Sequence, residues 1–268
     1  MKDLQLLHKE LEEQRILKEN KIIHDLQAIV QKYHQPKDLK QQEDLTQAIL
    51  SNNLAYYCDL YQLPDLFLTV QQERNINDAE AIFEYIGMCS HFMADVPDYK
   101  REMIGKHFLS LYPQIKEISV NNQLFSLDTT IGRIEYRLIS DQCYHKNIEL
   151  YKTLITSQRQ QMCYYLSYLL SKEFSIGAAL GMIKMYEFET PHCIGETQNE
   201  YWDATYNIIM NKENYQRITS FRPVQSLKYV DVMTLPETIS LGDQQCYSLY
   251  IALLNELYDL KKQGISIK

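Results

Sequence analysis

The chain has 268 residues and a net charge of −8 at neutral pH, with 45% hydrophobic and 23% charged residues. These ordinary values exclude intrinsic disorder over most of the chain, and the acidic balance argues against nucleic acid as the main partner. Only 8 Gly and 7 Pro occur. Because folds built from short strands need frequent turn residues, this scarcity predicts an all-α protein.

The sequence also indicates the cellular compartment in which the protein is expected. No apolar run is long enough to cross a bilayer, and the charged N-terminus does not resemble a signal peptide. The six cysteines show no paired spacing, which is typical of free thiols in a reducing environment. We therefore expect a cytoplasmic protein without membrane contact, in which most cysteines are small buried side chains.

The first predicted helix covers residues 2–33 and ends before Pro36. Leucines spaced three and four apart form one stripe along it, and Glu and Lys fill the remaining face. A terminal helix of this length either packs on the domain or pairs with another chain. Residues 1–36 are therefore a candidate peripheral element, and a candidate surface for a homodimer or a protein partner.

Further along the chain, the apolar spacing predicts helices over residues 40–61, 65–72, 78–94 and 98–112. Residues 113–128 are the most strand-like stretch, and Asn121 and Asn122 mark a turn, which predicts a small hairpin or an ordered loop. Beyond this stretch, helices are predicted over residues 130–156, 157–171, 174–190, 194–211, 212–219 and 242–262, with mixed loop at 220–240. No linker divides the chain, so residues 1–268 are predicted to form a single helical domain.

Candidate metal ligands occur as His/carboxylate pairs on predicted helices. His91 and Asp95 are four residues apart, as are Asp141 and His145, and Glu135 precedes the second pair by about two turns. Helical bundles build metal sites from inward-facing carboxylates and imidazoles of this kind. The alternative is that each pair is an ordinary surface contact or a hydrogen bond at a helix end.

Glu187 is the sharpest candidate for a catalytic group. The predicted helix 174–190 is apolar around nearly its whole circumference, and Gly177 and Gly181 would allow another backbone to approach, so a central position is expected. A carboxylate at the end of a buried helix needs a cation, a metal or a hydrogen-bond donor. Alternatively, Glu187 faces outward or pairs with a basic side chain such as Lys184.

Two stretches resemble the heme-oxygenase-like superfamily, in the branch that includes the chlamydial death-domain-associating protein, the pyrroloquinoline-quinone-forming oxidase and thiaminase-II-type proteins. The first has small residues and then a Tyr-Glu-x-x-x-Pro motif: Ala178-Ala179-Leu180-Gly181 followed by Tyr186-Glu187-Phe188-Glu189-Thr190-Pro191. The second is similar to the early helices of the family: Leu45-Thr46, Tyr56-Tyr57, Pro64 and Arg74. Together the matches cover about 75 residues, and a gap longer than the family's makes residues 113–150 a candidate insertion.

The resemblance implies a heme-oxygenase-like helical bundle and a non-heme iron or di-iron centre that includes Glu187. The family's last-helix ligand set contains histidines, but His192 is the last histidine of this chain, so that set is missing. Either a metal site is rebuilt from other residues, or no metal binds. The candidate ligands for a rebuilt site are Glu187, His145, Asp141, Glu135 and His91.

Two functions from different classes follow. The first is a small-molecule oxidase or oxygenase, with iron as cofactor and an amino-acid-like or aromatic metabolite as substrate. The second is a non-catalytic all-helical binding or interaction protein, of the immunity or effector type, that has lost the metal site. The segment 196–206, which contains Glu200, Trp202 and Asp203, either covers a pocket mouth or is an exposed amphipathic helix.

Overall fold

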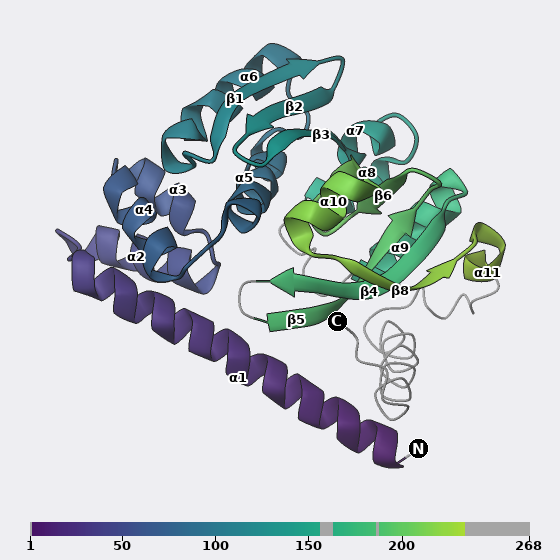
Figure 1. The fold of residues 1–268 in the computed structure, drawn as a ribbon, viewed down its shortest axis with the longest axis horizontal. Helices are drawn as coiled ribbons and strands as arrows, with labels where there is room; N and C mark the ends of the chain where they lie inside the picture. The colour runs from purple at the N-terminus through teal and green to yellow at the C-terminus, as the bar shows by residue number, and fades with distance from the viewer. Residues whose placement is uncertain (1, 156–162, 186–187, 234–268) are drawn as a thin grey trace.

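Helices make up the N-terminal part of the chain, and an eight-stranded antiparallel sheet dominates the rest (Figure 1). The computed structural model describes residues 2–155, 163–185 and 188–233; residues 1, 156–162, 186–187 and 234–268 lie outside this description. The prediction of an all-α, heme-oxygenase-like helical bundle is therefore wrong, because the protein is a mixed α/β fold.

The N-terminal helices begin close to the predicted positions, because local signals define where they start, but the predicted helix 40–61 is divided into two helices by a turn at residues 51–53. Asp38 caps the second helix through Gln41 N at 2.8 Å, and Asn77 and Glu80 form a reciprocal capping box at the start of the fifth. Pro64 begins the fourth helix, a position where its missing N–H costs nothing. The elements are α1 (Lys2–Tyr33), α2 (Leu39–Leu50), α3 (Leu54–Leu60), α4 (Pro64–Glu73), α5 (Asp78–Phe92), α6 (Asp98–His107) and the 3-10 helix η1 (Phe108–Leu111).

The sheet has the strand order β1-β2-β3-β7-β6-β5-β4-β8, with antiparallel neighbours throughout. Its strands are β1 (Ile115–Asn121), β2 (Leu124–Thr129), β3 (Gly132–Leu138), β4 (Gly177–Met185), β5 (Phe188–Glu196), β6 (Glu200–Asp203), β7 (Ile208–Asn211) and β8 (Arg222–Leu227). The helices between and after them are α7 (Ile139–Cys143), α8 (Ile148–Ile155), α9 (Cys163–Phe174), α10 (Lys212–Thr219) and α11 (Tyr229–Met233).

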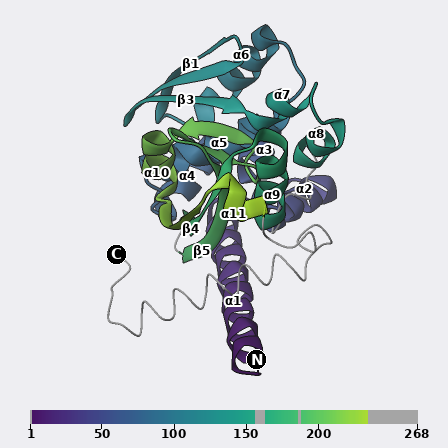
Figure 2. The same ribbon diagram turned by 90° about the vertical axis from the view of Figure 1, so that its right-hand side faces the viewer.

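Helices cover both faces of the central strands (Figures 1 and 2). Ile194 of β5 belongs to the largest hydrophobic cluster, together with side chains of α5 and α10, whereas its neighbour Cys193 packs on the α9 side. Ala179 and Leu180 of β4 divide between the two faces in the same way. The alternation of side chains along a strand therefore buries both faces of the sheet.

The prediction of a central helix over residues 174–190 is also wrong, because these residues contain all of β4 and the first three residues of β5. Their continuous apolar character fits a helix that is buried all round, but it fits equally a strand that is covered on both faces. Gly177 and Gly181 do allow a backbone to approach closely, as expected, but the backbone is that of β8. Glu187 itself lies outside the described residues.

Two more predicted helices are strands. Residues 132–138 within the predicted helix 130–156 form β3, where Ile134, Tyr136 and Leu138 are buried in alternation, and only α7 and α8 of that segment are helical. The predicted helix 194–211 contains the end of β5, β6 and β7. The predicted hairpin in 113–128 is confirmed as β1 and β2, with positive φ at Asn122 and Gln123 in the turn.

The long N-terminal helix is confirmed, and its C-terminal part packs on the helical region. Leu26 and Val30 are buried, and His34, just beyond the helix end, hydrogen-bonds the Tyr57 hydroxyl at 2.8 Å. The predicted helix 242–262 lies outside the described residues. Within the described part of the chain, no helix is both long enough and apolar enough to span a membrane.

We expect Gly181→Ala to destabilise the fold by about 1–3 kcal/mol, because a Cβ there would collide with the Arg222 carbonyl oxygen and lie 2.8 Å from the Phe221 ring. The measurement is the free energy of unfolding from chemical denaturation. Gly87→Ala on α5 is the matched control: its Cβ would meet the Tyr206 ring at 3.3 Å, and a change within about 1 kcal/mol is expected. Equal effects of the two substitutions would contradict the close β4–β8 contact.

Candidate active site

The structure disperses most of the predicted metal ligands. Glu135 lies on β3 and accepts hydrogen bonds from Ser126 and Arg133, and His91 is exposed near the end of α5. Of the four candidates that the structure describes, only Asp141 and His145 come together, beside the same pocket. In the described part of the chain, no group of three or more His, Cys, Asp or Glu side chains is arranged to hold a metal ion.

A different set of side chains converges elsewhere: Cys163 on α9, His192 on β5 and Asp203 at the end of β6. The β5–β6 pairing matches Gly195 with Trp202, so residues earlier in β5 lie beside residues later in β6. His192 and Asp203 project from the same face of the sheet, the one that α10 covers.

The His192–Asp203 pair is fully enclosed by protein. The two side chains are 7% and 0% exposed, and Nε2 of His192 lies 2.9 Å from Oδ2 of Asp203. Burial by itself would lower the pKa of His192, but the charge and hydrogen bond of Asp203, with a contribution from Cys163, raise it to about 10. Burial opposes the ionised form of Asp203, yet the imidazolium and its other hydrogen bonds lower the pKa of this carboxyl.

The remaining hydrogen bonds of Asp203 come from the adjacent turn and from α10. The backbone N–H groups of Thr205 and Tyr206 donate to Oδ1 at 2.9 Å and 3.4 Å. The Tyr215 hydroxyl of α10 donates to Oδ2 at 2.6 Å. A buried carboxylate with this many donors is compensated for its lost hydration, so the pair can remain charged inside the fold.

Cys163 reaches the same histidine from α9. The hydroxyl of Ser167, one turn later on α9, donates to the Cys193 carbonyl oxygen at 2.9 Å and thereby ties this helix face to β5. The Cys163 side chain lies close enough to the His192 ring to contribute to the raised pKa of the imidazole.

Cys163 also differs from the other described cysteines in its exposure. Cys58, Cys89, Cys143 and Cys193 are buried, whereas Cys163 is partly exposed. Burial raises the pKa of Cys58, Cys89 and Cys143 to about 12, which keeps these thiols protonated and unreactive. A partly exposed thiol beside an imidazolium is the environment in which a cysteine acts as a nucleophile.

Sequence reasoning treated these residues separately: Cys163 as one of several buried thiols, His192 as the last histidine, and Asp203 as part of a possible pocket cover. A signal was available in their order, a cysteine followed by a histidine and then an aspartate, each in an apolar segment. It became informative only once residues 188–196 and 200–203 were known to be neighbouring strands. Comparison with protein-family models, with curated proteins and with solved structures found no match to this chain.

We expect Tyr215→Phe to destabilise the fold by about 1.5–3 kcal/mol, because it removes a hydrogen bond to a buried charged carboxylate. Tyr136→Phe is the matched control, since the buried Tyr136 hydroxyl has no hydrogen-bond partner among the described residues and its removal should be neutral or stabilising. Both free energies are measured by chemical denaturation. Equal losses in the two variants would contradict the assigned role of the Tyr215 hydroxyl.

The raised pKa of His192 should also make stability depend on pH. Its charged form stabilises the fold fully below the unfolded value of 6.5, and this contribution is lost as the pH rises through about 10. The difference in unfolding free energy between wild type and His192→Gln should therefore shrink from pH 7 to pH 10. His34, whose pKa is lowered by burial and by Lys37, serves as control: the His34→Gln difference should stay constant over that range.

Proposed function

We propose that this protein is a cysteine-dependent enzyme of acyl transfer, with Cys163 as nucleophile, His192 as acid and base, and Asp203 as the residue that positions the imidazole. The observation that carries the proposal is that the buried His192 ring is bonded to a buried carboxylate through Nε2 and is influenced by the nearby, partly exposed Cys163 thiol. Nucleophile, base and orienting acid in this chain of contacts recur on unrelated folds that cleave carbonyl compounds.

The chemistry follows from the protonation states. The Cys163 thiolate attacks the carbonyl carbon of an amide, ester or thioester and forms an S–acyl bond. His192, as imidazolium, gives its proton to the departing nitrogen, oxygen or sulfur atom as the bond to the carbonyl carbon breaks. The neutral imidazole then takes a proton from water or another nucleophile, which attacks the thioester and releases the acyl group from Cys163.

Asp203 acts through His192 in this scheme. Its hydrogen bond to Nε2 holds the ring in place, and its charge stabilises the imidazolium. Tyr215 in turn fixes the carboxylate. No observation on the described residues favours the iron-dependent oxidation expected from the sequence, which stays a prediction that metal analysis of the purified protein would test.

The test uses p-nitrophenyl acetate as an activated acyl donor. We expect a burst of about one nitrophenolate per chain, and intact-mass spectrometry should show one acetyl group on Cys163. Cys163→Ala should abolish both signals, and Asp203→Asn should slow acylation about 10²–10⁴-fold.

Cys143→Ala is the matched control, because Cys143 is a buried thiol on α7 and its removal should leave the burst intact. Circular dichroism of each variant verifies folding. A burst of undiminished size in Cys163→Ala, or its absence from the folded wild type, would show that Cys163 is not an acyl acceptor.

A further inference from the structure

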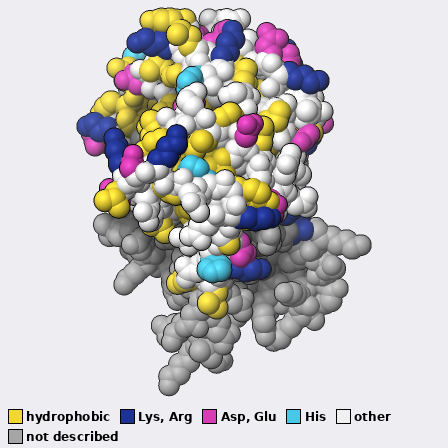
Figure 3. All heavy atoms as spheres, turned by 90° about the vertical axis from the view of Figure 1, so that its left-hand side faces the viewer, with side chains coloured by type: hydrophobic (Ala, Val, Ile, Leu, Met, Phe, Trp, Pro, Cys, Tyr) yellow, Lys and Arg dark blue, Asp and Glu magenta, His cyan; other side chains and the backbone are white. Residues whose placement is uncertain are grey.

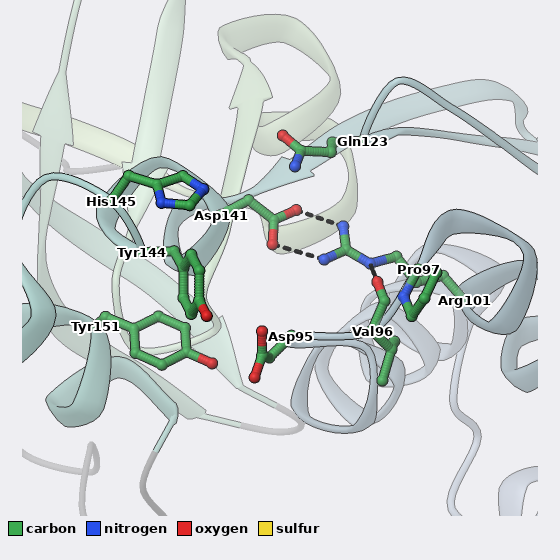
Figure 4. Close-up of a pocket in the computed structure, with 9 residues that line it drawn as sticks. All are labelled: Asp95, Val96, Pro97, Arg101, Gln123, Asp141, Tyr144, His145 and Tyr151. Carbon is green, nitrogen blue, oxygen red and sulfur yellow. Dashed lines mark hydrogen bonds and ion pairs between the residues drawn. The ribbon is translucent and has the colours of Figure 1, made fainter.

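A surface pocket of about 330 Å³ lies between the α5–α6 connection, α6, the β1–β2 turn, α7 and α8, and none of the three proposed active-site residues lines it. Figure 4 shows the side chains around it, with an ion pair along one wall and a group of oxygen atoms along another. Its size is suitable for a small organic molecule.

The ion pair joins Arg101 and Asp141, whose side chains are only 4% and 5% exposed. Both guanidinium NH₂ groups contact the carboxylate, one of them at 2.7 Å, and Nε donates to the Val96 carbonyl oxygen at 2.6 Å. Arg101 is thus neutralised and held in place within the wall. It is not free to attract an anionic ligand.

Asp95 supplies a second carboxylate without a matching cation. In the described part of the chain it forms no ion pair, and the Tyr151 side chain lies beside it. Figure 4 shows the hydroxyls of Tyr144 and Tyr151 pointing toward this carboxylate. With Arg101 matched to Asp141, the Asp95 carboxylate is the acidic side chain of the pocket that has no basic partner among the residues lining it.

Aromatic rings line the same space. Tyr144 and Tyr151 meet edge to face with centroids 5.1 Å apart, and the His145 ring lies 4.7 Å from Tyr144. Aromatic faces attract organic cations, and phenol oxygens can accept hydrogen bonds from an ammonium group. An excess carboxylate beside two tyrosines therefore favours a cation with an apolar body.

We propose that this pocket binds a small organic amine in its ammonium form, with the charged group on the Asp95 carboxylate and the hydrocarbon part against Tyr144 and Tyr151. The assignment does not depend on the acyl-transfer proposal, since the pocket and the Cys163 site share no residue. Its selectivity arises from charge: a neutral molecule of the same shape loses the contact with Asp95, and an anion is repelled by it.

The test is a ligand-observed NMR titration with three probes of similar size: butylammonium, butanol and butyrate. We expect saturable binding of butylammonium that weakens as the salt concentration rises, and much weaker or no binding of the other two. Asp95→Asn should weaken butylammonium binding about tenfold. Asparagine is the suitable replacement, because it tolerates the left-handed backbone of Asp95, with φ 57°.

Asp128→Asn is the control for surface charge, since Asp128 is an exposed carboxylate on β2 outside the pocket. The affinity of this variant for butylammonium should equal that of the wild type. Tyr144→Ala should also weaken binding, whereas Cys163→Ala should leave it unchanged even if it abolishes acylation. Equal affinity for butanol, tighter binding of butyrate, no saturable binding of butylammonium, or full affinity in Asp95→Asn would each overturn the proposal.

Discussion

The buried carboxylate of Asp203 is the constraint on which the C-terminal half of the structure depends. A charge with no exposed surface remains ionised only if donors replace the water that it has lost. Here the donors come from three places: the imidazole on β5, the backbone of the turn after β6, and the Tyr215 hydroxyl on α10. Satisfying one carboxylate therefore fixes the relative positions of two strands, a turn and a helix.

The sheet and its covering helices give this arrangement a rigid support. On one face, α9 is tied to β5 through the Ser167 hydroxyl. On the other face, the Tyr206 ring packs on the Phe83 ring of α5, with the ring centroids 4.4 Å apart. The backbone carbonyl oxygen of Tyr206 accepts a hydrogen bond from the Ser90 hydroxyl at 2.8 Å. Reactive groups on strands and helices that are packed on both sides hold their geometry better than groups on loops.

In the pocket beside α7, the presence or absence of a basic partner decides whether a carboxylate is available to bind a ligand. Asp141 was a candidate metal ligand because it lies four residues from His145 in the sequence. In the structure Arg101 already supplies the positive charge, so Asp141 is a structural partner. Asp95, which pairs with no basic residue in the described part of the chain, becomes the group available to a ligand.

The sequence by itself determined the elements whose signals are local. The beginnings of α2, α4 and α5 follow from Asp38, Pro64 and the Asn77–Glu80 capping box, and the β1–β2 hairpin follows from the turn at Asn122. Such signals act over three or four residues and need no tertiary partner.

Only the tertiary structure decided that residues 177–196 are strands and that Cys163, His192 and Asp203 form one site. The sequence of an apolar segment that is buried on all sides does not distinguish a helix from a strand. The spacing of apolar and polar residues that normally separates the two is absent when both faces are covered. The hydrogen bonds that distinguish the two run to β6 and β8, distant in sequence. The three reactive residue types were visible from the start, but their proximity is a product of strand pairing, and strand pairing is decided by the packing of the whole chain.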